Sequence, residues 1–223
     1  MDQTPKMTKV IKDFKIALKD FEPMVKEVKP LITGRDISNF SLRPREAWAN
    51  WLLCVVLRKV HARDITFAED EEGDGIIVDK TTETWVRTEH VSALDGPREV
   101  PLPKGEERVI AAINHKIDRG SDYAANKNLV VFFDGAGEFY RNKIRESIKG
   151  RHNFLTIYVI GLMWSNEDGY AYSVTEFQDD FSATFKVVIN DDFTDWTIYK
   201  VMDTLVTRPD GTTFGRTQDF LIL

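Results

Sequence analysis

The chain has 223 residues and a formal net charge of −6, which argues against a protein that coats nucleic acid non-specifically. Hydrophobic residues make up 42% and charged residues 30%, as in a globular protein, and no apolar run reaches the ~18 residues of a membrane span. The single cysteine, Cys54, cannot form an internal disulfide, so we expect a buried thiol and a reducing, cytoplasmic setting.

Residues 1–39 are predicted to form a helical segment that packs on the core. Val10, Phe14, Leu18 and Phe21 recur at helical spacing, which predicts an amphipathic helix within residues 6–29 that Pro23 breaks or ends. Seven lysines are spread along this stretch: Lys6, Lys9, Lys12, Lys15, Lys19, Lys26 and Lys29. They most simply form a solvated face of the helix, and the alternative is a surface that binds nucleic acid or a partner.

Residues 44–60 give the clearest helical pattern. Pro44 suits a first turn, and Trp48 and Trp51 belong to a broad apolar stripe, so most of the circumference should be buried. Glu46 and Asn50 lie on the side that continues to Leu53 and Leu57.

The middle of the chain alternates strands and helices. Short connections between the first three strands predict antiparallel hairpins. The expected elements are strands at 64–69, 75–79 and 84–92, a helix at 104–118, a strand at 128–134, a helix at 138–148 and a strand at 154–161. With the helix at 44–60, the order α-β-β-β-α-β-α-β predicts an α/β fold over residues 40–164, in which helices flank a mixed sheet in three layers.

Residues 165–223 are expected to be a β-rich extension of the same domain. The segments 170–174 and 185–189 have strand patterns, whereas 193–206 fits either a helix or strands. Pro209-Asp210-Gly211 is a turn signal.

Two carboxylates occupy unusual places in the predicted hairpins. Asp74 stands at the mouth of the strand at 75–79, and Glu89 lies inside the next strand. Two acids on neighbouring strands can hold one divalent cation, which stabilises charge on a phosphate and activates water. A lysine two residues after Glu89 would complete a metal-nuclease signature, but this position is Val91.

The element order and the two acids resemble the PD-(D/E)XK nuclease superfamily over roughly residues 40–162. The resemblance implies that Glu46 is the acid of the first helix and that Asp74 and Glu89 hold Mg²⁺ or Mn²⁺. It also implies DNA as the substrate or ligand. The departure at Val91 leaves the lysine's role to Lys116 on the following helix, as migrated lysines do in this superfamily, or to Lys104.

Other signals in the sequence are less specific. Five basic residues are either a solvated face or a surface that contacts the phosphate backbone: Arg141, Lys143, Arg145, Lys149 and Arg151. Residues 134–138 favour a structural strand-to-helix turn over an anion-binding loop. The four histidines show no zinc-ligand spacing, and His90, next to Glu89, is more simply a core or sheet-face residue.

Three functional hypotheses follow. The first is a Mg²⁺-dependent DNA endonuclease in which Glu46, Asp74, Glu89 and Lys116 form the catalytic site. The second, favoured by Val91, is an inactive relative that acts as a binding or regulatory subunit. The third is an unrelated α/β protein that forms oligomers. A homodimer or a larger complex fits each of them, and no membrane partner is expected.

Overall fold

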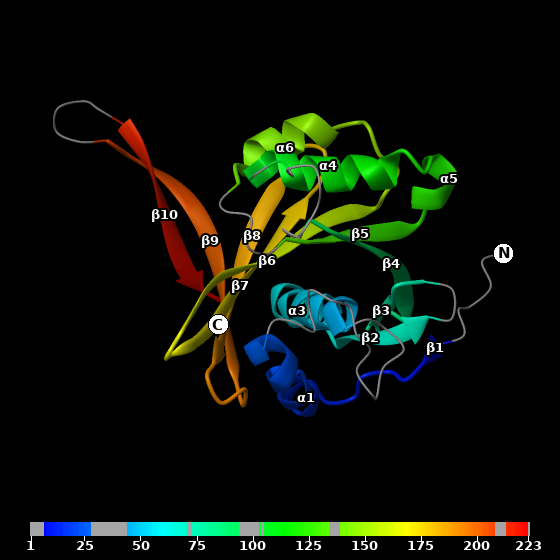
Figure 1. Cartoon of the computed structure of the whole chain (residues 1–223), viewed down its shortest axis with the longest axis vertical. Helices are drawn as coiled ribbons and strands as arrows, with labels where there is room; N and C mark the ends of the chain where they lie inside the picture. Colours follow the sequence, from blue (N-terminus) through cyan, green and yellow to red (C-terminus); the bar gives the residue numbers. More distant parts are fainter. Residues whose placement is uncertain are drawn as a thin grey trace.

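A computed structural model describes residues 7–27, 44–70, 73–93, 103, 105–133, 139–207 and 213–222. Within these residues, ten strands form one sheet in which the spatial order follows the chain order from β1 to β10. Helices α1 and α3 cover one face of the sheet, and α4, α5 and α6 cover the other (Figure 1). The predicted α/β fold, a mixed sheet between helices with a β-rich extension, is confirmed.

The element bounds agree closely with the predicted order in the middle of the chain. In chain order they are β1 Met7–Thr8, α1 Phe14–Glu27, α3 Pro44–His61, β2 Ile65–Asp70, β3 Ile76–Asp79, β4 Thr84–Ser92, α4 Gly105–Ile117, α5 Ser121–Ala124, β5 Lys127–Phe132, α6 Arg141–Ile148, β6 Thr156–Asn166, β7 Gly169–Phe177, β8 Ser182–Asn190, β9 Trp196–Thr207 and β10 Thr213–Leu221. Strands β4, β5 and β6 pair in parallel, and the other neighbouring strands pair antiparallel. The short α5 was not predicted.

The N-terminal helix starts later than the Val10–Phe21 pattern suggested and continues past Pro23. Helix α1 starts at Phe14 because Asp13 caps it: the backbone N–H groups of Lys15 and Ile16 donate to Asp13 Oδ1 at 2.8 and 3.1 Å. The prediction that Pro23 breaks or ends the helix is wrong, since Pro23 lies inside it. Burial of the apolar face offsets the lost backbone hydrogen bond.

Helix α3 forms the centre of the first core. Twelve of its 18 residues are buried, and Trp48 stacks on Trp51 with ring centroids 5.2 Å apart. The indole N–H of Trp51 donates to the carbonyl of Phe14 at 3.1 Å, which ties α1 to α3. Apolar residues on most of the helix circumference therefore pack against both α1 and the sheet, as the sequence predicted.

A second core fills the opposite face of the sheet. Helices α4 and α6 pack their apolar residues against β5 and β6, whose side chains are buried on both faces. Continuous apolar runs in parallel strands produce this double burial. Residues 134–138, with their candidate anion-binding turn, lie outside the described residues.

The C-terminal part continues the sheet. The segment that fitted either a helix or strands is strand β9, which pairs with β8, and the unpredicted β10 pairs with β9 from Thr213 opposite Thr207. The turn at 209–211 lies outside the described residues. Of the helices that the structure describes, none combines the length and the apolar character needed to cross a bilayer.

Candidate functional site

Strand β4 carries two polar clusters, one on each face of the sheet. Successive side chains of a strand point to opposite faces. Thr88 and His90 point to α3, whereas Glu89 points to α4 and α5. We name the first set the Asn50 network (Asn50, Gly75, Thr88 and His90), which holds the turn at Asp74, and the second the Glu89 cluster (Glu89, Lys116, Arg119, Tyr123 and Lys127).

In the Glu89 cluster, both carboxylate oxygens of Glu89 are hydrogen-bonded. Lys116 Nζ, from α4, lies 3.2 Å from Glu89 Oε2, and Lys127 Nζ, from the start of β5, lies 3.0 Å from Oε1. The hydroxyl of Tyr123, from α5, also donates to Oε2. Three elements that are separate in the sequence therefore meet at one carboxylate on β4.

Tyr123 contacts three cationic side chains at this site. Its hydroxyl accepts hydrogen bonds from Lys116 Nζ at 2.9 Å and from Arg119 Nη1 at 3.0 Å. Arg119 and Lys127 also lie over its ring, 4.4 and 4.5 Å from the centroid. Three cations around one carboxylate leave a formal excess of two positive charges in a protein that is acidic as a whole.

The contacts keep the Glu89 cluster ionised. Burial works to raise the pKa of Glu89, but the hydrogen bonds from Tyr123 and Lys127 outweigh it and hold the pKa below its usual range. Burial works to lower the pKa of Lys116, yet the hydrogen bond with Tyr123 and the charge of Glu89 raise it. At neutral pH the cluster is therefore a charged network.

The Asn50 network fixes the turn that carries Asp74. Asn50 Nδ2 donates to the carbonyl of Asp74 at 3.2 Å, and the backbone N–H of His90 donates to Asp74 Oδ2 at 2.8 Å. Thr88 is bonded to Gly75 twice, through its N–H at 2.8 Å and its hydroxyl at 3.1 Å. Helix α3 thus sets the position of Asp74 relative to β4.

Gly75 makes this arrangement possible. Its φ of +129° is a conformation that other residues rarely adopt. A Cβ atom here would lie only 2.5 Å from Asn50 Nδ2. The glycine therefore lets the Asn50 amide approach the backbone beside Asp74.

His90 is a neutral member of the Asn50 network. Because Asn50 donates through Nδ2, its Oδ1 accepts from His90 Nε2 at 3.1 Å, which assigns the Nε2–H tautomer. Burial, with the positive charges of Arg45 and Lys116, lowers the pKa of His90 to about 3. His90 thus stays uncharged at neutral pH and serves as a hydrogen-bond donor.

The structure brings together some of the predicted site residues. Lys116 reaches Glu89, and Asp74 lies beside residue 90 on the neighbouring strand. Glu46 is 7% exposed on α3, the helix on the opposite face of the sheet from Lys116, and lies one turn from Asn50. Val91 packs against the second core on the same side of β4 as Glu89. Lys104 lies outside the described residues.

The predicted basic cluster is largely neutralised by local acids. Lys143 pairs with Glu106 and Lys149 with Asp180. Arg145 lies 3.4 Å from Glu146. Arg151 donates to the carbonyl of Ser147 at 2.7 Å, and Arg141 begins α6. The excess of positive charge is larger in the Glu89 cluster than in this basic cluster, and it comes from Lys116, Arg119 and Lys127.

Sequence reasoning missed Tyr123, Lys127, Arg119 and the role of Asn50. The available signal was an amide, Asn50, in the apolar middle of a helix, which needs buried partners. Arg119 follows the end of α4 and Tyr123 belongs to α5, so their spacing of four residues was not a helical signal. The meeting of α5 with β4 had no signal in the sequence, because it depends on the parallel crossover between β4 and β5.

The two predicted metal ligands, Asp74 and Glu89, are oxygen donors of the kind that magnesium and manganese prefer to nitrogen and sulfur. Among the described residues no group of three or more His, Cys, Asp or Glu side chains is placed to hold a metal ion. Mg²⁺ often uses only one or two carboxylates and completes its shell with water and substrate phosphate. Asp74 and Glu89 would supply these carboxylates, although Glu89 is already bonded to two ammonium groups.

A comparison of the chain with protein-family models, with curated proteins and with solved structures finds no match. The chemistry of the site therefore rests on its own geometry.

Proposed function

We propose that the chain is a metal-dependent endonuclease-like protein of the PD-(D/E)XK type that hydrolyses phosphodiester bonds in DNA. One observation carries the proposal: Lys116 Nζ lies 3.2 Å from Glu89 Oε2. An ammonium group beside the carboxylate of the third core strand supplies the charge that Val91 does not. The element order around it and Asp74, just before the adjacent strand β3, add support.

Each residue has a distinct part in the proposed chemistry. Asp74 and Glu89 would hold Mg²⁺ or Mn²⁺, which when bound would offset phosphate charge and lower the pKa of water. Lys116 donates to a non-bridging phosphate oxygen, and Tyr123 orients Lys116 through its hydroxyl. Arg119 and Lys127 attract the DNA backbone. Glu46 supports the site only indirectly, through the helix that bears Asn50.

The setting we propose is cytoplasmic. Cys54 is a free, buried thiol, and burial raises its pKa, which keeps it unreactive. A protein with one inert cysteine needs no oxidising compartment.

A plasmid-nicking assay with Mg²⁺ and with Mn²⁺ tests the proposal. We expect the parent protein to nick supercoiled DNA and both Asp74→Asn and Glu89→Gln to lose the activity. Asp79→Asn is the matched control, because Asp79 is a carboxylate at the other end of β3 that binds the N–H groups of Thr81 and Thr82. Nicking by Asp74→Asn at the parental rate would overturn the assignment.

A second candidate is a DNA-binding protein without cleavage activity. It is favoured because both oxygens of Glu89 are already bonded to protein groups. A metal ion would have to compete for Glu89 with Lys116, Lys127 and Tyr123. Absence of nicking with either metal, together with DNA binding that weakens in Lys116→Met and Lys127→Met, would select this function over the first.

A further inference from the structure

Strand β10 ends the sheet with an open edge. Along its nine residues it pairs with β9 in an unbroken register, and within the described residues it pairs with no other strand. Figure 1 shows its outer side turned away from the helices and from the rest of the sheet. The strand at the opposite edge, β1, is only two residues long. An open edge as long as β10 presents a row of backbone N–H and C=O groups with which another chain can pair.

The outer half of the β9–β10 hairpin has no third strand in the described part of the chain. Strand β8 pairs with β9 only as far as Thr184, which lies opposite Val201. From Met202 to Thr207, β9 pairs with β10 alone. Two strands by themselves are marginally stable in water, and a third strand stabilises them. A strand added to the outer side of β10 would therefore stabilise this ribbon.

The hydrogen-bond pattern determines which backbone groups of β10 face outward. The N–H of Ile222 donates to the carbonyl of Ile198 at 3.1 Å, and these residues are directly opposite in the register that pairs Leu221 with Tyr199. Hydrogen-bonded and non-hydrogen-bonded pairs alternate in an antiparallel ladder. The even-numbered residues of β10 are therefore bonded to β9, and the odd-numbered ones present their backbone groups outward: Thr213, Gly215, Thr217, Asp219 and Leu221.

This edge is complementary to itself. We propose that β10 pairs antiparallel with β10 of a second copy of the chain, so that the two sheets join across a two-fold axis. Pairing over the full length from Thr213 to Leu221 places the midpoint, Thr217, opposite itself. Because Thr217 faces outward, its N–H can donate to the Thr217 carbonyl of the second copy, and the reverse bond forms by symmetry.

The same register avoids repulsion between like charges. It places Asp219 opposite Gly215 of the second copy, so no carboxylate faces another one across the axis. Centring the pair on Asp219 would instead oppose the two carboxylates. Charge therefore favours the full-length register that the hydrogen-bonding pattern also favours.

Exposed apolar side chains around the edge suit a protein partner. Met202, Phe220 and Leu221 are 42%, 45% and 51% exposed. In the proposed register Phe220 lies opposite position 214 of the second copy and Leu221 opposite position 213, so pairing covers both ends of the edge.

The charge of the hairpin does not favour DNA as the partner. A two-stranded ribbon can enter the major groove, but affinity for DNA depends on an excess of positive charge. Residues 196–221 carry three basic and three acidic side chains: Lys200, Arg208, Arg216, Asp203, Asp210 and Asp219. A neutral hairpin with a self-complementary edge fits a second copy of the chain better.

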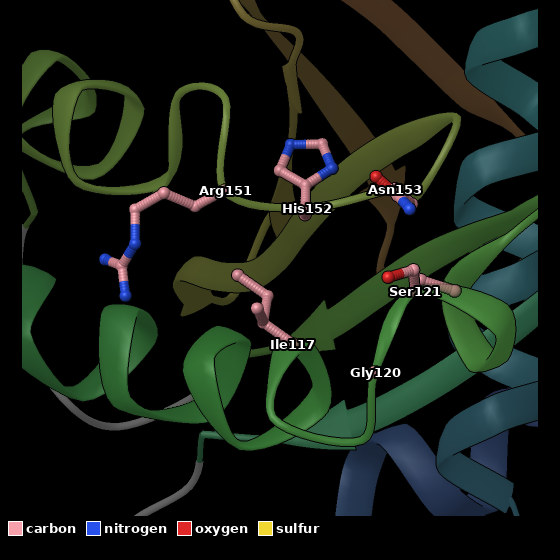
Figure 2. Close-up of a pocket in the computed structure, with 7 residues that line it drawn as sticks. Ile117, Gly120, Ser121, Arg151, His152 and Asn153 are labelled. Carbon is pink, nitrogen blue, oxygen red and sulfur yellow. The ribbon is translucent and has the colours of Figure 1, made fainter.

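The hollow at the end of α4 offers less to a partner than this edge does. Its volume is about 140 Å³, below the ~300 Å³ of typical small-molecule pockets. In Figure 2 the imidazole of His152 points away from Ile117 and Ser121, which line the hollow. The edge of β10 instead presents its hydrogen-bonding groups in one continuous row.

Size-exclusion chromatography with light scattering tests the proposal. We expect a mass of twice the 25.6 kDa of one chain, which falls toward the mass of one chain on dilution. Thr217→Pro removes an N–H that β9 does not use, and Thr217→Lys places two lysines opposite each other at the axis. Each variant should raise the dissociation constant of the dimer at least about tenfold. Thr197→Lys, at an exposed threonine of β9, is the matched control and should keep the parental constant.

Cross-linking locates the axis. A short bis-maleimide should join two copies of a Thr217→Cys protein, because the two engineered thiols lie opposite each other in the proposed register. Thr197→Cys should remain a single chain under the same conditions. The native Cys54 is buried, so it does not compete for the reagent.

Three results would overturn the proposal. One is the mass of a single chain at every concentration, and another is a dimer that persists in both Thr217 variants and does not cross-link through position 217. The third is a parent protein that is monomeric and loses DNA binding in Thr217→Pro, which would assign the ribbon to DNA. The proposed function is tested separately, since a dimer that never nicks DNA retains this interface and a monomer that nicks DNA loses it.

Discussion

The polar side chains on the two faces of β4 differ in charge. Toward α3, Asn50, Thr88 and His90 form a buried network without ionised side chains of its own, which holds the Asp74 turn. Toward α4, Glu89, Lys116 and Lys127 form a network of charges whose side chains are mostly buried but keep 11–23% of their surface exposed. The first network uses hydrogen bonds with fixed directions, whereas the second concentrates charge near solvent.

One strand can therefore fix the geometry of a site from one face and supply its charged side chains on the other. A buried neutral network is rigid, because each unmade hydrogen bond would leave a desolvated polar atom. A partly exposed charged network can exchange its partners for a phosphate or a metal ion. We therefore expect substitutions on the α3 face to affect folding first and those on the α4 face to affect activity first.

Lys116→Met should give the largest effect, on the α4 face. Loss of the ammonium that faces the phosphate is expected to lower the rate of nicking by about 10²–10³-fold, the range seen when one stabilising donor is removed from a transition state. The rate of plasmid nicking measures this loss. Lys59→Met, at the exposed end of α3, is the charge-matched control, and a Lys116→Met protein as fast as this control would show that Lys116 has no part in the chemistry.

Gly75→Ala should give the largest loss of stability, on the α3 face. The left-handed φ and the 2.5 Å approach of Asn50 Nδ2 together are expected to lower the free energy of unfolding by about 3 kcal/mol. Urea denaturation measures the loss. Gly150→Ala is the matched control, since Gly150 has a φ of +64° but no atom within 4 Å of an added Cβ.

The same experiment can be refined with a second substitution. If the clash with Asn50 contributes to the loss of stability in Gly75→Ala, this substitution should lower the free energy of unfolding less in an Asn50→Ala background than in the parent. Strict additivity of the two losses would mean that backbone strain alone explains the glycine.

His90→Gln should change how stability depends on pH. The pKa of His90 is about 3 in the folded protein and near 6.5 when unfolded, so its contribution is complete above pH ~6.5 and is lost as the pH falls toward 3. In the parent, the free energy of unfolding should decrease by up to about 1.4 kcal/mol per pH unit from this group.

In His90→Gln, the free energy of unfolding should fall less steeply between about pH 6.5 and 5 than it does in the parent. Glu89 does not contribute in this range, because its lowered pKa affects stability only below about pH 4.3. Urea denaturation at a series of pH values measures the slope. His115→Gln, at an exposed position of α4, should keep the parental slope, and an unchanged slope in His90→Gln would contradict burial of a neutral imidazole.

Lys127→Met should give the smallest effect on stability. The Lys127–Glu89 pair is partly exposed and Glu89 keeps Lys116 and Tyr123, so the free energy of unfolding should change by less than about 1 kcal/mol. DNA binding should weaken, and its logarithmic salt dependence should fall by about one. Lys80→Met, an exposed lysine of the β3–β4 turn, should leave that dependence unaltered.

Local sequence pattern predicted most of the fold between residues 44 and 161. The apolar run of α3 and the buried strands β5 and β6 were recognisable because their burial leaves continuous hydrophobic stretches. The N-terminal helix was misjudged at Pro23, where packing outweighs a lost hydrogen bond. Strand β9 was ambiguous and β10 was missed, because their strand state depends on pairing with β8 and with each other.

The candidate site was only partly predictable for the same reason. Asp74, Glu89 and Lys116 were selected by residue type and by element order, which the chain encodes locally. The partners of Glu89 were decided by the parallel crossover that carries α4 and α5 over β4, and this brings Tyr123 and Lys127 from 34 and 38 residues away.

The sequence by itself determined which residues can be charged, which apolar runs must be buried and where the strands in the middle of the chain begin. Only the tertiary structure decided that Glu89 meets Lys116 on one face of β4 while Asn50 and His90 hold Asp74 from the other. The physical reason is that hydrophobic periodicity specifies the face of each element, whereas contacts between distant elements depend on how the whole sheet is assembled.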